Sequence, residues 1–222
     1  MTLRVDIEAL VLDQTGDTAR LRDGAIDRAI DEAVRRYSKD RPRPVMADIA
    51  GTGAHIMVAP VGWEASSRIT AVAWPADRDP PAYRPAGDIV PYDGADGTRL
   101  LVRTSPAPAP GETVRITFTA SHRLTDTANT IPDADTGAVA ALAAALLLEQ
   151  LAAAVAGDTD PTIPADSVDH KSASDRYAAR ARAARKIYDD HLAADGADPG
   201  TAPLAVADVA LPGRPGLLRG RP

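Results

Sequence analysis

The sequence has no cysteine among its 222 residues, so it can form no disulfide and offers no thiolate as a nucleophile or zinc ligand. Aromatic residues are scarce too, with one Phe, two Trp and five Tyr, and alanine supplies much of the 45% apolar share. An alanine side chain buries little area, so an alanine-rich helix gains less from burial than one rich in Leu or Phe. We therefore expect this chain to gain extra burial from neighbouring subunits.

Basic residues are almost all arginine, and acidic residues outnumber them, which gives a net charge of −6 and a pI near 5.2. Such a chain is not expected to bind nucleic acid over its whole surface, although a local basic patch is compatible with these totals. The first residues, 1–13, lack the basic start and apolar run of a signal peptide.

The stretch Gly137–Gly157 is long enough to span a bilayer. Glu149 and Gln150 interrupt it, its alanines contribute little to membrane insertion, and no aromatic belt or basic cluster flanks it. We expect a buried or interface helix here and no membrane partner.

Four segments carry apolar residues at helical spacing. The expected helices cover residues 4–12, 19–39, 136–156 and 168–194. Asp17 or Thr18 can cap the second of them, because their side-chain oxygens accept free backbone N–H groups. Prolines at positions 42 and 44 forbid that helix from continuing.

Between the second and third helices the apolar period changes to two. The clearest strand is Glu112–Ser121, with Val114, Ile116 and Phe118 on one face. Weaker strands are expected at residues 54–59, 68–74, 89–92 and 99–104. The fold class predicted from these patterns is α+β: a mainly α-helical bundle at 1–194 with a small antiparallel β insertion at 45–122. Residues 195–222, rich in Gly and Pro, are expected to form an extended C-terminal arm that docks on another subunit.

Three stretches follow one another in a notable order. They are AIDRAIDEAVRRYSKDRPR (25–43), VRITFTASHRLTDTANTIPDAD (114–135) and DRYAARARAARKIYDDHL (175–192). In this order, with a strand-rich insertion between the first two, they resemble the head–tail adaptor (connector) proteins of tailed bacteriophages. The resemblance covers residues 1–194.

This resemblance implies a structural virion protein and not an enzyme. Its subunits would form a ring, usually of twelve, beneath the portal protein at the neck of the virion. The ring would extend the channel for the genomic DNA and bind a stopper or tail protein on its other side. The protein would be made in the host cytoplasm. Adaptors of this family often extend a C-terminal segment into the portal, so the apolar residues of the arm become candidates for portal docking: Leu204, Val206, Val209, Leu211, Leu217 and Leu218.

The strongest local signal is a basic stretch on the last expected helix. It contains Lys171, Arg176, Arg180, Arg182, Arg185 and Lys186, and only Asp175 opposes them between residues 171 and 186. A ring of such helices could line a DNA channel or a subunit interface and attract phosphate. The alternative is a solvated helix face, or one paired with acidic neighbours such as the loop at 158–166, and we favour this second interpretation.

No motif points to catalysis, a cofactor or a metal. The four histidines are far apart and show no His-x-x-x-His or HExxH spacing, and we expect a structural hydrogen bond at His122. Neither a phosphate-binding loop nor a Gly-x-Ser-x-Gly elbow is present. Two alternatives stay open. One is a cytoplasmic enzyme or small-ligand binder with an unrecognised carboxylate site. The other is a different neck component, such as a stopper or tail-completion protein, although these are usually shorter and richer in β-structure.

Overall fold

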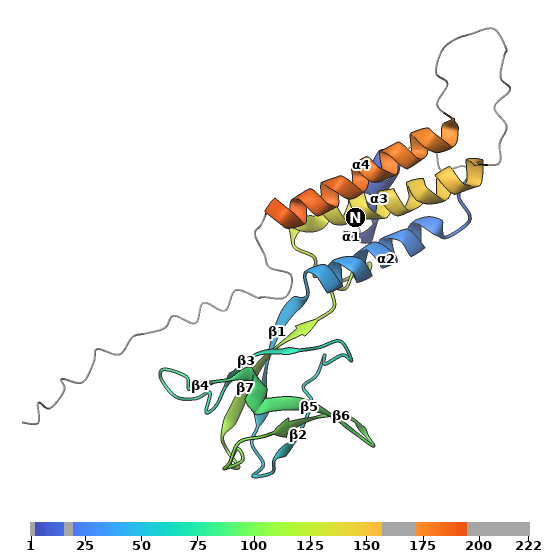
Figure 1. Ribbon diagram of the computed structural model, residues 1–222. Helices are drawn as coiled ribbons and strands as arrows, with labels where there is room; N and C mark the ends of the chain where they lie inside the picture. The colour runs from blue at the N-terminus through green and yellow to red at the C-terminus, as the bar shows by residue number, and fades with distance from the viewer. Residues whose placement is uncertain (1–2, 16–19, 157–171, 195–222) are drawn as a thin grey trace, which may run out of the picture.

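The computed structural model describes residues 3–15, 20–156 and 172–194, which form a helical layer above a β unit (Figure 1). The helices are α1 (Leu3–Thr15), α2 (Ala25–Asp40), α3 (Asp133–Val155) and α4 (Ala173–Ala194). Helix α3 lies at the centre of this layer and contacts each of the other three.

Helix α2 shows why the sequence folds this way locally. Its buried residues include Ala29, Ile30, Ala33, Val34 and Tyr37, spaced three and four apart on one face. The helix begins at Ala25 and not at residue 19 as predicted, because Gly24 adopts a left-handed conformation with φ of 69°. The predicted capping residues lie outside the described part of the chain.

Helix α3 carries the core of the helical layer. Every residue from Ala138 to Ala145 is buried, and Leu147, Leu148 and Leu151 follow. Within the described residues, α3 is the one helix long and apolar enough to cross a membrane, with a mean hydropathy of 2.0. However, 72% of its most apolar window is buried inside the protein, as in the central helix of a folded core.

Within the described ranges, seven strands form two antiparallel sheets. They are β1 (Arg43–Ala50), β2 (Ile56–Val58), β3 (Ile69–Ala73), β4 (Tyr83–Arg84), β5 (Ile89–Gly94), β6 (Gly97–Val102) and β7 (Thr113–Ala120), with a short 3₁₀ helix, η1 (Ala86–Asp88), before β5. The first sheet has the order β1-β7-β3-β4 and the second β2-β6-β5. Their inner faces share one core, in which Ile116 and Phe118 of β7 join Leu100 and Val102 of β6.

This architecture corrects the predicted fold class. The protein is mixed α/β, with four helices and two sheets, and is not a mainly helical bundle with a small insertion. The prediction at 112–121 is confirmed as β7, but the strand it pairs with along its full length, β1, was missed. The prolines at 42 and 44 predicted the end of the second helix, and it ends at Asp40. Pro44 lies in β1, an edge strand, where a missing N–H removes no necessary ladder bond.

The other predicted elements differ from the structure mainly at their ends. The first helix continues to Thr15, beyond residue 12. The last helix begins at Ala173, and Ser172 caps it by accepting a hydrogen bond from the backbone N–H of Asp175 at 3.1 Å. Of the weaker strands, 54–59 and 68–74 shorten to β2 and β3, 89–92 lengthens to β5, and 99–104 shifts by two residues to β6. The two-residue strand β4 was not predicted.

Candidate functional site: the surface of α4, the junction below it and an exposed sheet face

Helix α4 carries the predicted basic patch on its exposed side. Tyr188 and two small residues, Ala181 and Ala184, face inward, and α4 packs along α3. The five predicted cations within the described residues are exposed: Arg176, Arg180, Arg182, Arg185 and Lys186. Lys171 lies outside the described residues, as do the six apolar positions predicted for the arm.

Two of these cations are paired with carboxylates. The Arg185 guanidinium lies 2.7 Å from Glu149 of α3, and the Lys186 ammonium lies 2.6 Å from Asp190, one turn further along α4. Both pairs are exposed and weak in stability terms, but they reduce the local positive charge. The predicted basic stretch ends at Lys186, and Asp189 and Asp190 follow it, so the surface of α4 is more mixed in charge than predicted.

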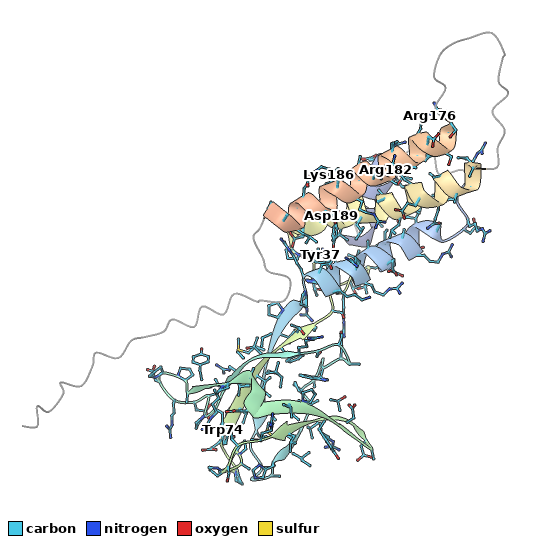
Figure 2. All side chains as sticks on the ribbon, in the orientation of Figure 1. Tyr37, Trp74, Arg176, Arg182, Lys186 and Asp189 are labelled. Atoms are coloured by element: carbon cyan, nitrogen blue, oxygen red, sulfur yellow. The ribbon has the colours of Figure 1, made fainter. Side chains whose placement is uncertain are left out.

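Arg176 and Arg182 are the cations best placed to act on a partner (Figure 2). Among the residues that the structure describes, neither guanidinium has an ion-pair partner. Six residues at 100° each separate their directions by about 120° around the helix. They therefore form two separate positive points along α4 and not one continuous stripe.

A groove with a volume of about 440 Å³ lies between α2 and α3. It is lined by Arg28, Ala29, Glu32, Leu146, Glu149, Gln150 and Ala153. Its carboxylates are paired with arginines, Glu32 with Arg35 at 3.0 Å and Glu149 with Arg185 at 2.7 Å. Two free converging carboxylates, which general acid–base chemistry would need, are not found in this groove.

The most organised polar cluster is buried where the helical layer meets the β unit, and its centre is Asp135 in the first turn of α3. The phenol of Tyr37 donates to one carboxylate oxygen. The other oxygen accepts from Arg41 at 3.1 Å and lies 2.6 Å from the His191 ring nitrogen. Burial alone would raise the pKa of Asp135, but hydrogen bonds from Tyr37 and His191 and the charge of Arg41 hold it below its usual value.

A second carboxylate extends this cluster to the end of α4. The Tyr188 phenol donates to Asp40 at 2.7 Å, and the Arg36 guanidinium donates to the same oxygen at 2.9 Å. Burial raises the pKa of the Tyr188 phenol well above its usual value, and the hydrogen bond to Asp40 adds to the effect. The ends of α2 and α4 are thereby held together.

His122 completes the cluster on the side of the β unit, two residues after β7. Its backbone N–H donates to the Ser38 hydroxyl at 2.9 Å, and its ring lies 4.8 Å from that of Tyr37. The two ring nitrogens lie 2.8 Å and 3.0 Å from the carbonyl oxygens of Thr130 and Arg41. Burial nevertheless lowers the pKa of His122. The structural hydrogen bonding predicted for this histidine is confirmed.

This junction cluster consists of Arg36, Tyr37, Ser38, Asp40, Arg41, His122, Thr130, Asp135, Tyr188 and His191. It links the helical layer to the β unit, because it joins α2, α3, α4 and the segment after β7. Of these residues the sequence singled out only His122 for a structural hydrogen bond, and no periodicity or motif showed that the ten meet. Among the described residues, no group of three His, Cys, Asp or Glu side chains is placed to hold a metal ion.

A further surface was missed altogether. Ile56, Val58 and Tyr92, on the outer face of the second sheet, are 49%, 63% and 49% exposed. The available signal was the absence of alternation: β2 reads Ile-Met-Val and β6 ends in Leu-Leu-Val, so both faces of these strands are apolar. A strand with one wet face would alternate apolar and polar residues.

In comparisons with known proteins, no family model and no curated protein sequence matches this chain. What can be said of its function therefore rests on the residues and their arrangement.

Proposed function

We propose that the protein is a head–tail adaptor of a tailed bacteriophage, a structural and non-enzymatic subunit of the virion neck. Twelve copies would form a ring beneath the portal protein, extend the channel through which the genomic DNA passes, and bind the stopper or tail protein. Subunits repeated around one axis meet through heterologous contacts that close into a ring.

The observation that carries this proposal is where the resembling stretches meet. Residues 25–43 supply Tyr37, Arg41 and their neighbours to the junction cluster. Residues 114–135 supply His122, Thr130 and Asp135, and residues 175–192 supply Tyr188 and His191. Every member of the cluster lies in one of these three stretches. In this protein the three stretches therefore form one spatial unit, which supports considering them together.

The surface of α4 supports a role beside DNA only in part. Arg176 and Arg182 would attract phosphate if α4 faces the channel, since cations near a phosphate backbone release its counterions. Arg185 and Lys186 are already paired with carboxylates. For Arg185 and Lys186 the ion pairs favour the alternative interpretation, in which this side of α4 is a solvated face whose charges are paired within the protein.

The β-structure supports a second candidate function, that of another neck component such as a stopper. Seven strands in two sheets are more than the sequence predicted, and high β content is typical of that class. The four helices, with α3 and α4 each longer than twenty residues, favour the adaptor.

The proposal is tested by inactivating the gene in the phage that carries it and viewing the lysate by electron microscopy. DNA-filled heads without tails, beside free finished tails, are expected, and a plasmid copy of the gene should restore joined particles. Infectious particles of normal form without the gene would exclude the adaptor. Cross-linking in wild-type particles separates the two neck candidates, because an adaptor is linked directly to the portal and a stopper is linked to the ring below it.

A further inference from the structure

The outer face of the β2-β6-β5 sheet is mostly apolar, with one arginine, Arg99, in its central strand. In the register, Ile56 pairs with Leu101 and Leu101 with Val90, while Val58 pairs with Arg99 and Arg99 with Tyr92. Directly opposed residues point to the same face of a sheet. We call this set the outer patch: Ile56, Val58, Val90, Tyr92, Arg99 and Leu101.

The opposite side of the β unit has a different character. The outer face of the first sheet carries the ion pair between Asp48 and Arg115, at 2.7 Å, among Thr113, Thr117 and Thr119. Met46 and Tyr83 are its exposed apolar residues, at 63% and 64%; Tyr83 shares this face because it pairs with Ala73, which pairs with Arg115. The two sheets therefore enclose one core, and the outer face of the first carries more polar and charged side chains than that of the second. Contiguous exposed apolar surface in a folded protein commonly marks a binding site.

The chain itself contains a segment that fits this patch. Residues 204–211, outside the described part of the structure, read LAVADVAL. If the segment is extended, Leu204, Val206 and Asp208 share one face, because side chains alternate along a strand. That face offers two apolar side chains followed by one carboxylate.

The charge in this face matches the one charge in the patch. Arg99 carries that charge, and the other members of the outer patch are apolar or aromatic. Its ion pair with Asp96 is long, at 3.5 Å, and the Asp96 side chain is 83% exposed. Such a pair contributes little, so Arg99 can accept a second carboxylate. Leu204 and Val206 would then cover Ile56, Val58 and Tyr92, with Asp208 beside Arg99.

The position where α4 ends, beside the first sheet, is compatible with a segment supplied by a neighbouring subunit. The Arg41 guanidinium donates to the Leu192 carbonyl at 3.5 Å, so the last turn of α4 lies beside the start of β1. Strand β1 is an edge strand of the first sheet, whereas the outer patch is the outer face of the second. Residues 195–203 span at most about 30 Å when fully extended. In a ring with heterologous contacts, each subunit turns opposite sides to its two neighbours.

We propose that residues 204–211 of one subunit dock on the outer patch of the next subunit. This inference rests on the ring of the proposed function and names the contact that would close it. It gives the arm a partner within the ring, in place of the portal protein that the resemblance implies.

The absence of cysteine allows a direct test on the purified full-length protein. One preparation carries Val58→Cys and the other Val206→Cys, and the two are mixed and treated with a short bismaleimide. A linked dimer of the two variants is expected, several-fold above the yield from Met46→Cys mixed with Val206→Cys. Met46 is a matched control because it is also 63% exposed but lies on the more polar outer face of the first sheet.

The charge match gives a second measurement. Adding Asp208→Arg to the Val206→Cys chain should lower the yield of the linked dimer, and adding Arg99→Asp to the Val58→Cys chain should restore it. A yield no higher than the Met46 control overturns the proposal. The proposal is also overturned if the Val58→Cys/Val206→Cys double variant forms cross-links only within one chain, because the segment would then dock on its own subunit. Linked dimers together with normal particles from the inactivated phage would instead leave this docking of the arm standing and exclude the neck function.

Discussion

The Asp135 carboxylate, in the first turn of α3, accepts a hydrogen bond from the phenol of Tyr37, in the last turns of α2. Ninety-eight residues separate the two in the chain, and the whole β unit is inserted between them. The start of α3 and the end of α2 are the two points at which the chain passes between the helical layer and the β unit. A bond between them therefore holds the entrance and the exit of the insertion together.

Replacing Asp135 should destabilise the protein strongly. Asp135→Asn removes a buried charge that Tyr37, Arg41 and His191 all contact, and so breaks the ion pair with the Arg41 guanidinium, which is 17% exposed. Breaking a buried ion pair from one side costs about 3–5 kcal/mol. Urea denaturation measures the change in unfolding free energy. Asp133→Asn, in the same turn but exposed, is the control and should change stability by less than about 0.5 kcal/mol.

Stability should fall steeply in alkali because of two buried phenols. Burial, together with a hydrogen bond to a carboxylate, raises the pKa of Tyr37 and of Tyr188 far above the usual value. The unfolded chain loses these protons near pH 10, whereas the folded protein keeps them. Their contribution to stability is therefore complete below about pH 10 and is lost as the pH rises toward the folded-state values.

The Tyr37→Phe/Tyr188→Phe variant checks this. Its unfolding free energy, from urea denaturation at pH 8 and pH 11, should change less between the two pH values than that of the wild type. Tyr83→Phe, whose ring is 64% exposed, should keep the wild-type difference. If the unfolding free energy changes equally between pH 8 and pH 11 in all three proteins, the two buried phenols do not govern alkaline unfolding.

The close packing of α3 makes it intolerant of larger side chains. Ala144 is fully buried and belongs to the core shared by the helical layer. Ala144→Leu should cost about 1–3 kcal/mol of unfolding free energy, because a close-packed core has no room for three more carbons. Ala154→Leu, at an exposed position of the same helix, should be nearly neutral. Thermal unfolding followed by circular dichroism compares the two, and equal midpoints would contradict the packing described for α3.

The sequence predicted the elements better than their assembly. Periodicity located four helices and β7, because amphipathic and alternating patterns are local properties. Strand β1 was missed because it contains Pro44, and proline is tolerated in a strand mainly at the edge of a sheet. The position of β1 at the edge is set by its pairing with β7, some seventy residues away, and so is not visible in the local sequence. Without β1 and β4 the predicted insertion was small and the protein was predicted to be mainly helical, which the seven strands in two sheets contradict.

The candidate sites divide in the same way. The cations of α4 are visible in the sequence, but the partners that neutralise Arg185 and Lys186 become evident only when α3 and the next turn of α4 are in place. The junction cluster joins residues from three distant stretches, so no local pattern could reveal it. The outer patch did leave a signal in the apolar triplets of β2 and β6. This signal was ambiguous, because strands that are buried on both faces show the same apolar triplets.

Whether α4 faces DNA can be decided with Arg176 and Arg182. If both bind phosphate, Arg176→Gln/Arg182→Gln should weaken binding of the purified protein to duplex DNA and lower the salt dependence. The slope of log K against log salt should fall by about 0.9 for each phosphate that is no longer neutralised, so by about 2 for each bound subunit. Fluorescence anisotropy of a labelled duplex over a series of salt concentrations measures both quantities.

Arg185→Gln provides the matched control on the same helix. Arg185 is already paired with Glu149, so removing its charge also frees a carboxylate that repels phosphate. Affinity should then fall while the slope changes by less than in the Arg176→Gln/Arg182→Gln variant. If that double variant binds DNA with an unchanged slope, Arg176 and Arg182 belong to a solvated face and do not contact phosphate.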